Sequence, residues 1–368
     1  MKKLILILIF TLFVMFSLPV CAESGDDILK ASGADELYAG DALEAGGVSF
    51  ERPESIFSLT PDKIWEIIKD TATDKQSDPL KLMAAIMTLI ILASLAESAG
   101  GTIRYKEAGG IFRLICILAC AIILTDPVCR CLDTVTTALE GGSEFMLGFV
   151  PVFSGLMAAG GHVTSAGGYS FAVLGFSEAA IKVSSHLFIP MLSMCICIAI
   201  ADACCDGINL TSLLNGVKKI VTWGLGLVTT IFTGLLSIQS IVAASADSVS
   251  LRTAKFLLSN TVPLVGAAAS EAYATVKGSI SVMKSGVGGI GIASLAFILL
   301  PPLIETVLYK LIFSVLGITA DVFGSKKLSA LFKNMNAVLS AALGILICFM
   351  LMFIISTGVM MTICKDAV

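Results

Sequence analysis

Long apolar runs recur along this chain and constrain its fold more than any other feature. The sequence is 56% hydrophobic and 14% charged, with a mean hydropathy of +0.94, whereas soluble domains carry about 25% charged residues. A run of about 20 apolar residues can cross a bilayer as a helix. The sequence therefore predicts an all-α, polytopic transmembrane protein. The six predicted spans are Leu80 to Ala96, Leu114 to Val128, Leu187 to Cys204, Ile220 to Ala244, Ile292 to Ile318 and Ala337 to Ile363.

The beginning of the chain has the layout of a signal peptide, residues 1–22. Lys2 and Lys3 precede an apolar run, and the run is followed by Val20 and Ala22 at a cleavage position. Lipid attachment at Cys21 is a weaker alternative because such sites prefer a smaller residue than Val20, and an uncleaved anchor is the other.

An acidic segment, residues 23–79, follows and is predicted to lie outside the cytoplasm. It holds 14 acidic and 5 basic residues. Its later part starts a helix at Pro61, and Ile64, Ile67 and Ile68 fall on one face. This pattern predicts a short amphipathic helix that lies on the membrane or on a neighbour.

Motifs of enzymes and cofactor sites are missing from the sequence, which contains no Walker A motif and no HExxH motif. The pair Cys129 and Cys131 lacks the spacing and the histidines of a zinc site. Gly286, Gly288 and Gly291 match GxGxxG, but no strand precedes them and no acidic residue follows at the required distance. They indicate close helix packing or a hinge. We expect no enzyme activity, no cofactor and no metal, and no nucleic-acid partner, since no basic cluster is interleaved with aromatics.

Charge in the loops gives one topology and leaves another open. If residues 23–79 are outside, the first helical hairpin, residues 80–141, presents Arg104, Lys106 and Arg113 to the cytoplasm, as the positive-inside tendency favours. Counting membrane crossings from residues 23–79 places the basic residues between Arg252 and Lys284 outside the cytoplasm as well. If Phe145 to Ala159 crossed the membrane as a separate span, the sides would be reversed for everything after it.

Proline spacing indicates a tandem repeat. Val150-Pro151 precedes Val262-Pro263 by 112 residues, and Pro190 precedes Pro302 by the same distance. The predicted repeats are residues 142–252 and 253–368. Equivalent basic loops require both halves to share one orientation, so segments 145–185 and 256–285 are predicted to be matched re-entrant or short amphipathic hairpins.

A polar, glycine-bearing stretch, residues 252–291, lies between two strongly apolar spans. Polar inserts of this kind between membrane helices are usual places for function. The stretch and the span before it contain these motifs: Ser237-Ile238-Gln239, Ala246-Asp247-Ser248, Arg252-Thr253-Ala254-Lys255-Phe256, Asn260, Val262-Pro263 and Gly266. Together they resemble the stage III sporulation protein AE family of endospore-forming bacteria.

The resemblance implies a role in the multiprotein channel between mother cell and forespore. It implies a permease-like or platform subunit in the mother-cell-derived membrane that supports late forespore gene expression. The implied partners are other stage III sporulation membrane proteins, a secretion-type ATPase, ring-forming subunits and membrane lipid, and the protein could also pair with its own copies. Two alternatives stay open, which are a self-contained secondary transporter and a scaffold that conducts nothing.

Two groups of residues are candidates for the functional site. Ionisable side chains inside a span usually face protein or water, and the span with Pro301-Pro302 contains Glu305 and Lys310. The candidate hinge, pore or family-motif residues are Pro151, Thr253, Ala254, Lys255, Phe256, Asn260, Pro263, Gly266, Gly286, Gly288, Gly289 and Gly291.

Overall fold

The computed structural model describes residues 61–100, 106–204, 210–261 and 266–363. These residues are almost entirely helical and include no strand, which confirms the predicted all-α class. The predicted signal peptide and residues 23–60 lie outside the described part. The elements are α4 (Pro61–Lys75), α5 (Ser77–Gly100), α6 (Lys106–Ala159), α7 (Val163–Val183), the π-helical turn η2 (Ser184–Phe188), α8 (Ile189–Cys204), α9 (Thr211–Thr261), α10 (Gly266–Val322) and α11 (Lys326–Ile363).

Six apolar helical segments in the described ranges are long enough to cross a membrane. They are Ser77–Leu95, Leu114–Ala159, Val163–Cys204, Thr211–Ser250, Gly286–Val322 and Lys326–Thr362. Each predicted span overlaps one of them. With 54 residues, α6 is about 80 Å long, whereas the hydrocarbon core of a bilayer is about 30 Å thick. The bundle is therefore longer than the membrane is thick.

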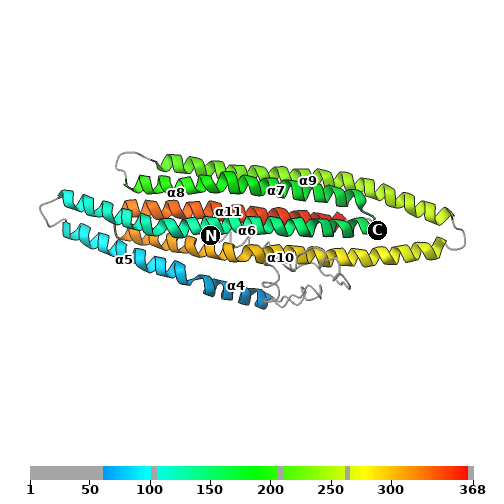
Figure 1. The fold of residues 1–368 in the computed structure, drawn as a ribbon, viewed down its shortest axis with the longest axis horizontal. Coiled ribbons are helices and arrows are strands. Elements are labelled where there is room, and N and C mark those ends of the chain that lie inside the picture. The colour runs from blue at the N-terminus through cyan, green and yellow to red at the C-terminus, as the bar shows by residue number, and fades with distance from the viewer. Residues whose placement is uncertain (1–60, 101–105, 205–209, 262–265, 364–368) are drawn as a thin grey trace.

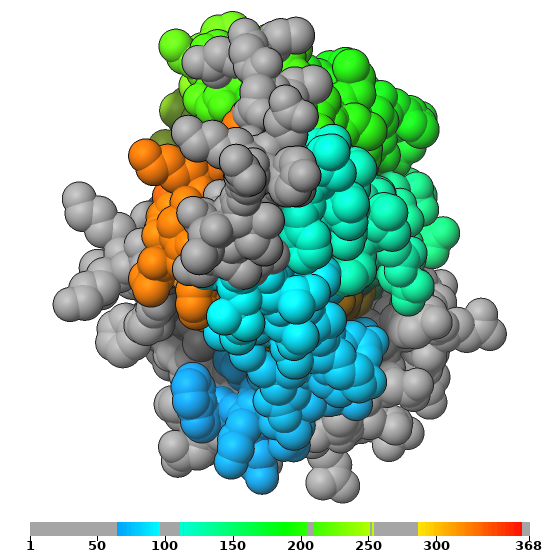
Figure 2. All heavy atoms as spheres, turned by 90° about the vertical axis from the view of Figure 1, so that its left-hand side faces the viewer, coloured from blue at the N-terminus to red at the C-terminus, as the bar shows by residue number. Residues whose placement is uncertain are grey.

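The helices lie side by side along one axis (Figure 1). The end of α6 and the start of α7 lie at one end of the bundle, and the end of α9 and the start of α10 extend beyond them. At the opposite end of the bundle, α5 ends and α6 begins, α8 ends and α9 begins, and α10 ends and α11 begins. Figure 2 shows this end of the bundle face-on, with α4 at the bottom. Rod α7–α8 and helix α10 thus run in the same direction, the orientation that the predicted repeats require.

Segment 145–185 turns back on itself at residues 160–162, but its two helical parts continue into longer helices. Phe145 to Ala159 forms the last turns of continuous helix α6, and the chain then turns into α7. The helix continues through Gly142 because its neighbours cover this point: a Cβ added there would lie 2.9 Å from the Phe349 ring and 3.3 Å from Leu295. Tertiary packing therefore overrides the low helix propensity of glycine. The repeat boundaries at 141/142 and 252/253 both fall inside helices.

A π-helical turn, η2, joins α7 to α8 without ending the helical rod. Pro190 has no N–H, and its ring crowds the carbonyl four residues earlier. The N–H of Ile189 bonds the carbonyl of Ser184, five residues back, so the helix widens before the proline. Phe188 then meets α9 at Gly224, where an added Cβ would lie 2.7 Å from the ring.

Cysteines placed at Thr253 and Val322 should react from opposite sides of the membrane. Both residues are exposed, and they lie near opposite ends of the bundle. Lys326 and Lys327 follow Val322, so the positive-inside tendency predicts that this end is cytoplasmic. In a chain without native cysteines, an impermeant maleimide should label Thr253→Cys on intact cells and Val322→Cys only after the membrane is opened. Labelling of both from one side would contradict this topology.

Candidate functional site

An aromatic ladder on α6 forms the centre of the bundle. Phe145, Phe149 and Phe153 recur every four residues, so they lie on one face of the helix. Successive ring centroids are 5.5 and 5.6 Å apart, and the rings are nearly parallel. Phe353 of α11 meets the ring of Phe149 edge-on at 5.7 Å, and Tyr169 of α7 meets that of Phe153 at 5.4 Å. All five side chains are buried, so α7 and α11 both interlock with α6 through these rings.

The glycines Gly288 and Gly291 of α10 let this helix approach the ladder. A Cβ at Gly291 would overlap the ring of Phe149. A Cβ at Gly288 would overlap the terminal methyl of Met361 on α11 and lie 3.2 Å from the Phe153 ring. Small residues of this kind permit close contact between membrane helices. The structure therefore places both glycines at a close helix–helix contact.

Other predicted residues lie at or near this contact. Gly286 is buried, while an added Cβ at Gly289 would meet nothing within 4 Å. Pro151 is exposed on α6 and lies between Phe149 and Phe153 in the sequence. Thr253 is exposed near the end of α9, and its hydroxyl bonds the carbonyl of Val249. Pro263 lies outside the described residues, as do the side chains of Ala254, Lys255, Phe256 and Asn260, and Gly266 is the first residue of α10.

The family-like motifs before residue 252 pack α9 onto α7. Gln239 lies against Gly168, where an added Cβ would come within 2.8 Å of the side-chain nitrogen. Asp247 is buried and accepts hydrogen bonds from the backbone N–H groups of Thr164 and Ser165, each at 2.9 Å. This role of Asp247 was not predicted from the sequence. A lone acidic residue in a long apolar helix was the available signal, but its partner is more than 80 residues away in the chain.

The two predicted ionisable residues of α10 have different surroundings. The side chain of Glu305 is 17% exposed, and its Oε2 lies 3.6 Å from Nζ of Lys75 on α4. The next residue, Thr306, is buried and contacts the Cys131 thiol of α6 at 3.4 Å. Lys310 is half-buried on the same helix. Glu305 therefore ties α4 to the bundle, a contact that the sequence does not reveal.

Several ion pairs lie on outer faces of the long helices. Arg130 and Asp126 are 2.6 Å apart on α6, and the Arg130 side chain is 74% exposed. On α7, Lys182 and Glu178 are 3.1 Å apart, and Ser143 of α6 donates to Glu178. Ionised side chains this exposed are costly in hydrocarbon. They must lie at lipid headgroups, in water or against a partner.

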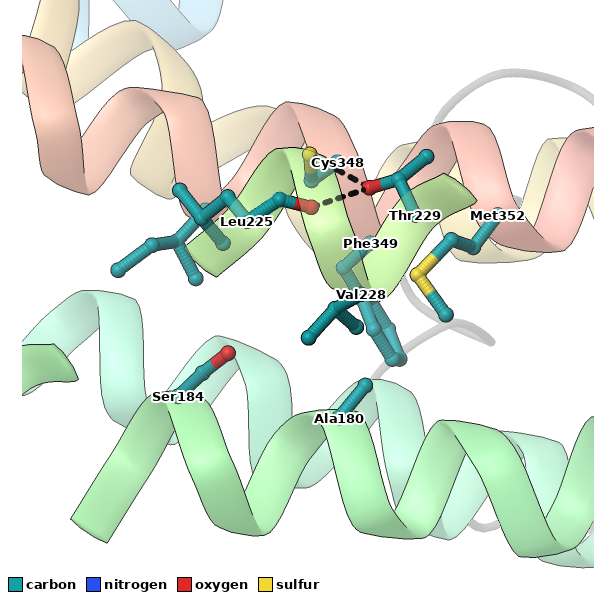
Figure 3. Close-up of a pocket in the computed structure, with 9 residues that line it drawn as sticks. Ala180, Ser184, Leu225, Val228, Thr229, Cys348, Phe349 and Met352 are labelled. Carbon is teal, nitrogen blue, oxygen red and sulfur yellow. Dashed lines mark hydrogen bonds between the residues drawn. The ribbon is translucent and has the colours of Figure 1, made fainter. Parts of the chain in front are cut away.

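A small cavity opens among α7, α9 and α11 (Figure 3). The centre of a water-sized sphere can occupy about 10 Å³ of it, which is room for about one water. Val228, Phe349 and Met352 make its walls apolar, and the hydroxyl of Thr229 bonds the carbonyl of Leu225. This space cannot hold a solute or form a conduit.

These features define a multi-pass α-helical membrane protein with a tightly packed centre. Within the described ranges, no three His, Cys, Asp or Glu side chains are grouped as a metal site would require. The family model described as "Stage III sporulation protein AE" matches residues 53–364. The chain therefore belongs to the stage III sporulation protein AE family, as the motifs in residues 237–266 predicted.

A curated relative is the Stage III sporulation protein AE of Bacillus subtilis (strain 168). It is 24% identical to this chain over 240 residues, which cover 64% of this chain. The match spans 60% of the relative, less than two thirds of its length. No solved structure matches the chain.

Proposed function

We propose that this protein is the membrane-embedded platform, or permease-like subunit, of a sporulation-specific secretion or feeding channel between mother cell and forespore. In this role it supports late forespore gene expression. It would lie in the mother-cell-derived membrane, with the acidic segment 23–79 outside the cytoplasm after signal cleavage. Membership of the AE family and the six apolar helical segments support a sporulation membrane assembly.

The filled interior of the bundle favours a platform over a self-contained transporter. The ladder from Phe145 to Phe153 occupies the space between α6, α10 and α11, where a conduit through one copy would run. The cavity that adjoins Phe349 holds about one water. A path for solutes would therefore lie between this chain and its neighbours.

The proposed neighbours are other stage III sporulation membrane proteins, a secretion-type ATPase and ring-forming subunits, with further copies of this chain as another option. Lys327 donates to the carbonyl of Asp202 at 3.3 Å and so fixes the α10–α11 turn to α8. Lys326, beside it, is exposed. If this end is cytoplasmic, Lys326 is available to an acidic surface of the ATPase.

The purified chain, reconstituted alone, should not conduct. Vesicles that contain it and a small trapped dye should release the dye at the same rate as vesicles without protein, because side chains fill the centre of the described helices. Vesicles that contain the chain together with its partner subunits should release the dye faster. Rapid release by the chain alone would contradict the platform role and favour a secondary transporter.

The cellular role is tested by deleting the gene in the sporulating host. We expect unchanged vegetative growth, a strong loss of late forespore reporter activity and recovery when the gene is restored. A deletion strain with normal reporter activity would overturn the proposed role in the channel. Measuring membrane levels of the other subunits in the same strain separates a platform from a permease-like subunit, because loss of a platform should also reduce their assembly.

A further inference from the structure

The first turn of α7 lacks a cap of its own. His162 precedes the helix and makes no side-chain capping bond. The first backbone N–H groups of a helix have no partner within it, and an unpaired buried N–H is costly. Here two of them donate to a side chain of another helix: Thr164 N–H to Oδ1 of Asp247, and Ser165 N–H to Oδ2.

Asp247 is held in this position by more than one interaction. Its side chain is only 3% exposed, and Nδ1 of His162 lies 3.9 Å from its Oδ2. The positive end of the α7 dipole favours a carboxylate here. A buried carboxylate is tolerated only when such partners replace water. Asp247 and the start of α7 therefore depend on each other.

The contact lies where α9 leaves the body of the bundle. Beyond Asp247, α9 continues for 14 residues to Thr261, or about 21 Å. Rod α7–α8 begins only at Val163, so it does not accompany this part of α9. Figure 1 shows the ends of α9 and α10 reaching past the α6–α7 turn. We call these projecting ends, residues 248–261 of α9 and the first turns of α10 from Gly266, the arm.

We propose that Asp247 acts as a latch that fixes the direction of the arm relative to the α6–α7 turn. Both oxygens of one carboxylate bond adjacent N–H groups, so the contact resists rotation of α9 as well as separation from α7. Below it, Gln239 packs against Gly168 and Phe232 against Phe176, and these contacts keep the two helices together when the latch is open. Opening the latch frees the arm without unfolding the body.

The test measures distances between spin labels in the full chain, in a background without native cysteines. One pair, Phe171→Cys with Thr253→Cys, joins α7 to the arm. The control pair, Phe171→Cys with Trp223→Cys, joins the same helices below the latch. All three positions are exposed. Asp247→Asn replaces one of the two acceptor oxygens by an NH2 donor and removes the negative charge, so the arrangement of one oxygen for each N–H is lost.

In Asp247→Asn, the distance distribution of the arm pair should widen at least twofold, while that of the control pair stays unchanged. A second variant removes the donor instead: Thr164→Pro deletes one N–H in the first turn, where proline is tolerated. It should also widen the distance distribution of the arm pair. Its matched control is Val163→Pro, which deletes an N–H that does not bond Asp247. This control should leave the distance distribution of the arm pair unchanged.

Two results would overturn the latch. An arm pair of unchanged width in both Asp247→Asn and Thr164→Pro would mean that the arm is held by other contacts. Equal widening of the arm pair and the control pair would mean that Asp247 stabilises the whole fold and fixes no particular direction.

Discussion

Phe149→Ala should lower the stability of the bundle by about 3–5 kcal/mol, the range for truncating a buried phenylalanine. Phe149 is 3% exposed and lies between two parallel rings and the edge of Phe353. Its removal leaves a cavity where three helices meet. Thermal unfolding of the purified protein in detergent, followed by circular dichroism, would measure the loss.

The matched control for this substitution is Phe171→Ala on α7. Phe171 is 81% exposed, so the same chemical change removes little packing within the chain. Its melting temperature should stay close to that of the natural sequence. Equal losses for the two variants would show that the ladder contributes no more than a surface ring.

Gly291→Val should also destabilise the protein, by about 1–3 kcal/mol, the usual cost of overpacking a core. The new side chain would collide with the ring of Phe149, which its stacked neighbours hold in place. Gly289→Val, two residues away on the same helix, enters open space and should be nearly neutral. The difference in melting temperature between these two valine variants is the quantity to measure.

A double-mutant cycle distinguishes a steric clash from a general intolerance of α10. In the Phe149→Ala background, the side chain at position 291 would occupy the vacated space. The double variant should then lose less stability than the two single variants together, with a coupling within about 0.5–3 kcal/mol. Strict additivity would show that Gly291 does not act through Phe149.

Hydropathy predicted the six helices because a bilayer leaves few other options: backbone groups in hydrocarbon must bond within a helix or a closed barrel. The close approach of Gly288 and Gly291 was one of two interpretations of the GxGxxG match. Choosing it over a hinge required the positions of Phe149 and Met361, which lie on other helices. Local sequence carries no information about such partners.

The continuity of α6 and the pairings of the buried acids were not predictable in the same way. Glycine has a low helix propensity, so the sequence around Gly142 suggests a break in the helix. The contact with Phe349, which keeps the helix continuous, is visible only in the structure. The pairings of Glu305 with Lys75 and of Asp247 with the start of α7 join residues far apart in the chain. A residue pattern can mark such acids as unusual within a span, but only the packing of the helices identifies their partners.

The length of the helices has a mechanical consequence. A rod about 80 Å long, such as α6, converts an angular change into a displacement that grows with distance from the pivot. A tilt of about 5° at one end moves the other by about 7 Å over such a length. Because α6 is interlocked with α10 and α11, the three would turn as one lever. A displacement applied at one end of these helices would then appear as movement at the other end without any helix unwinding.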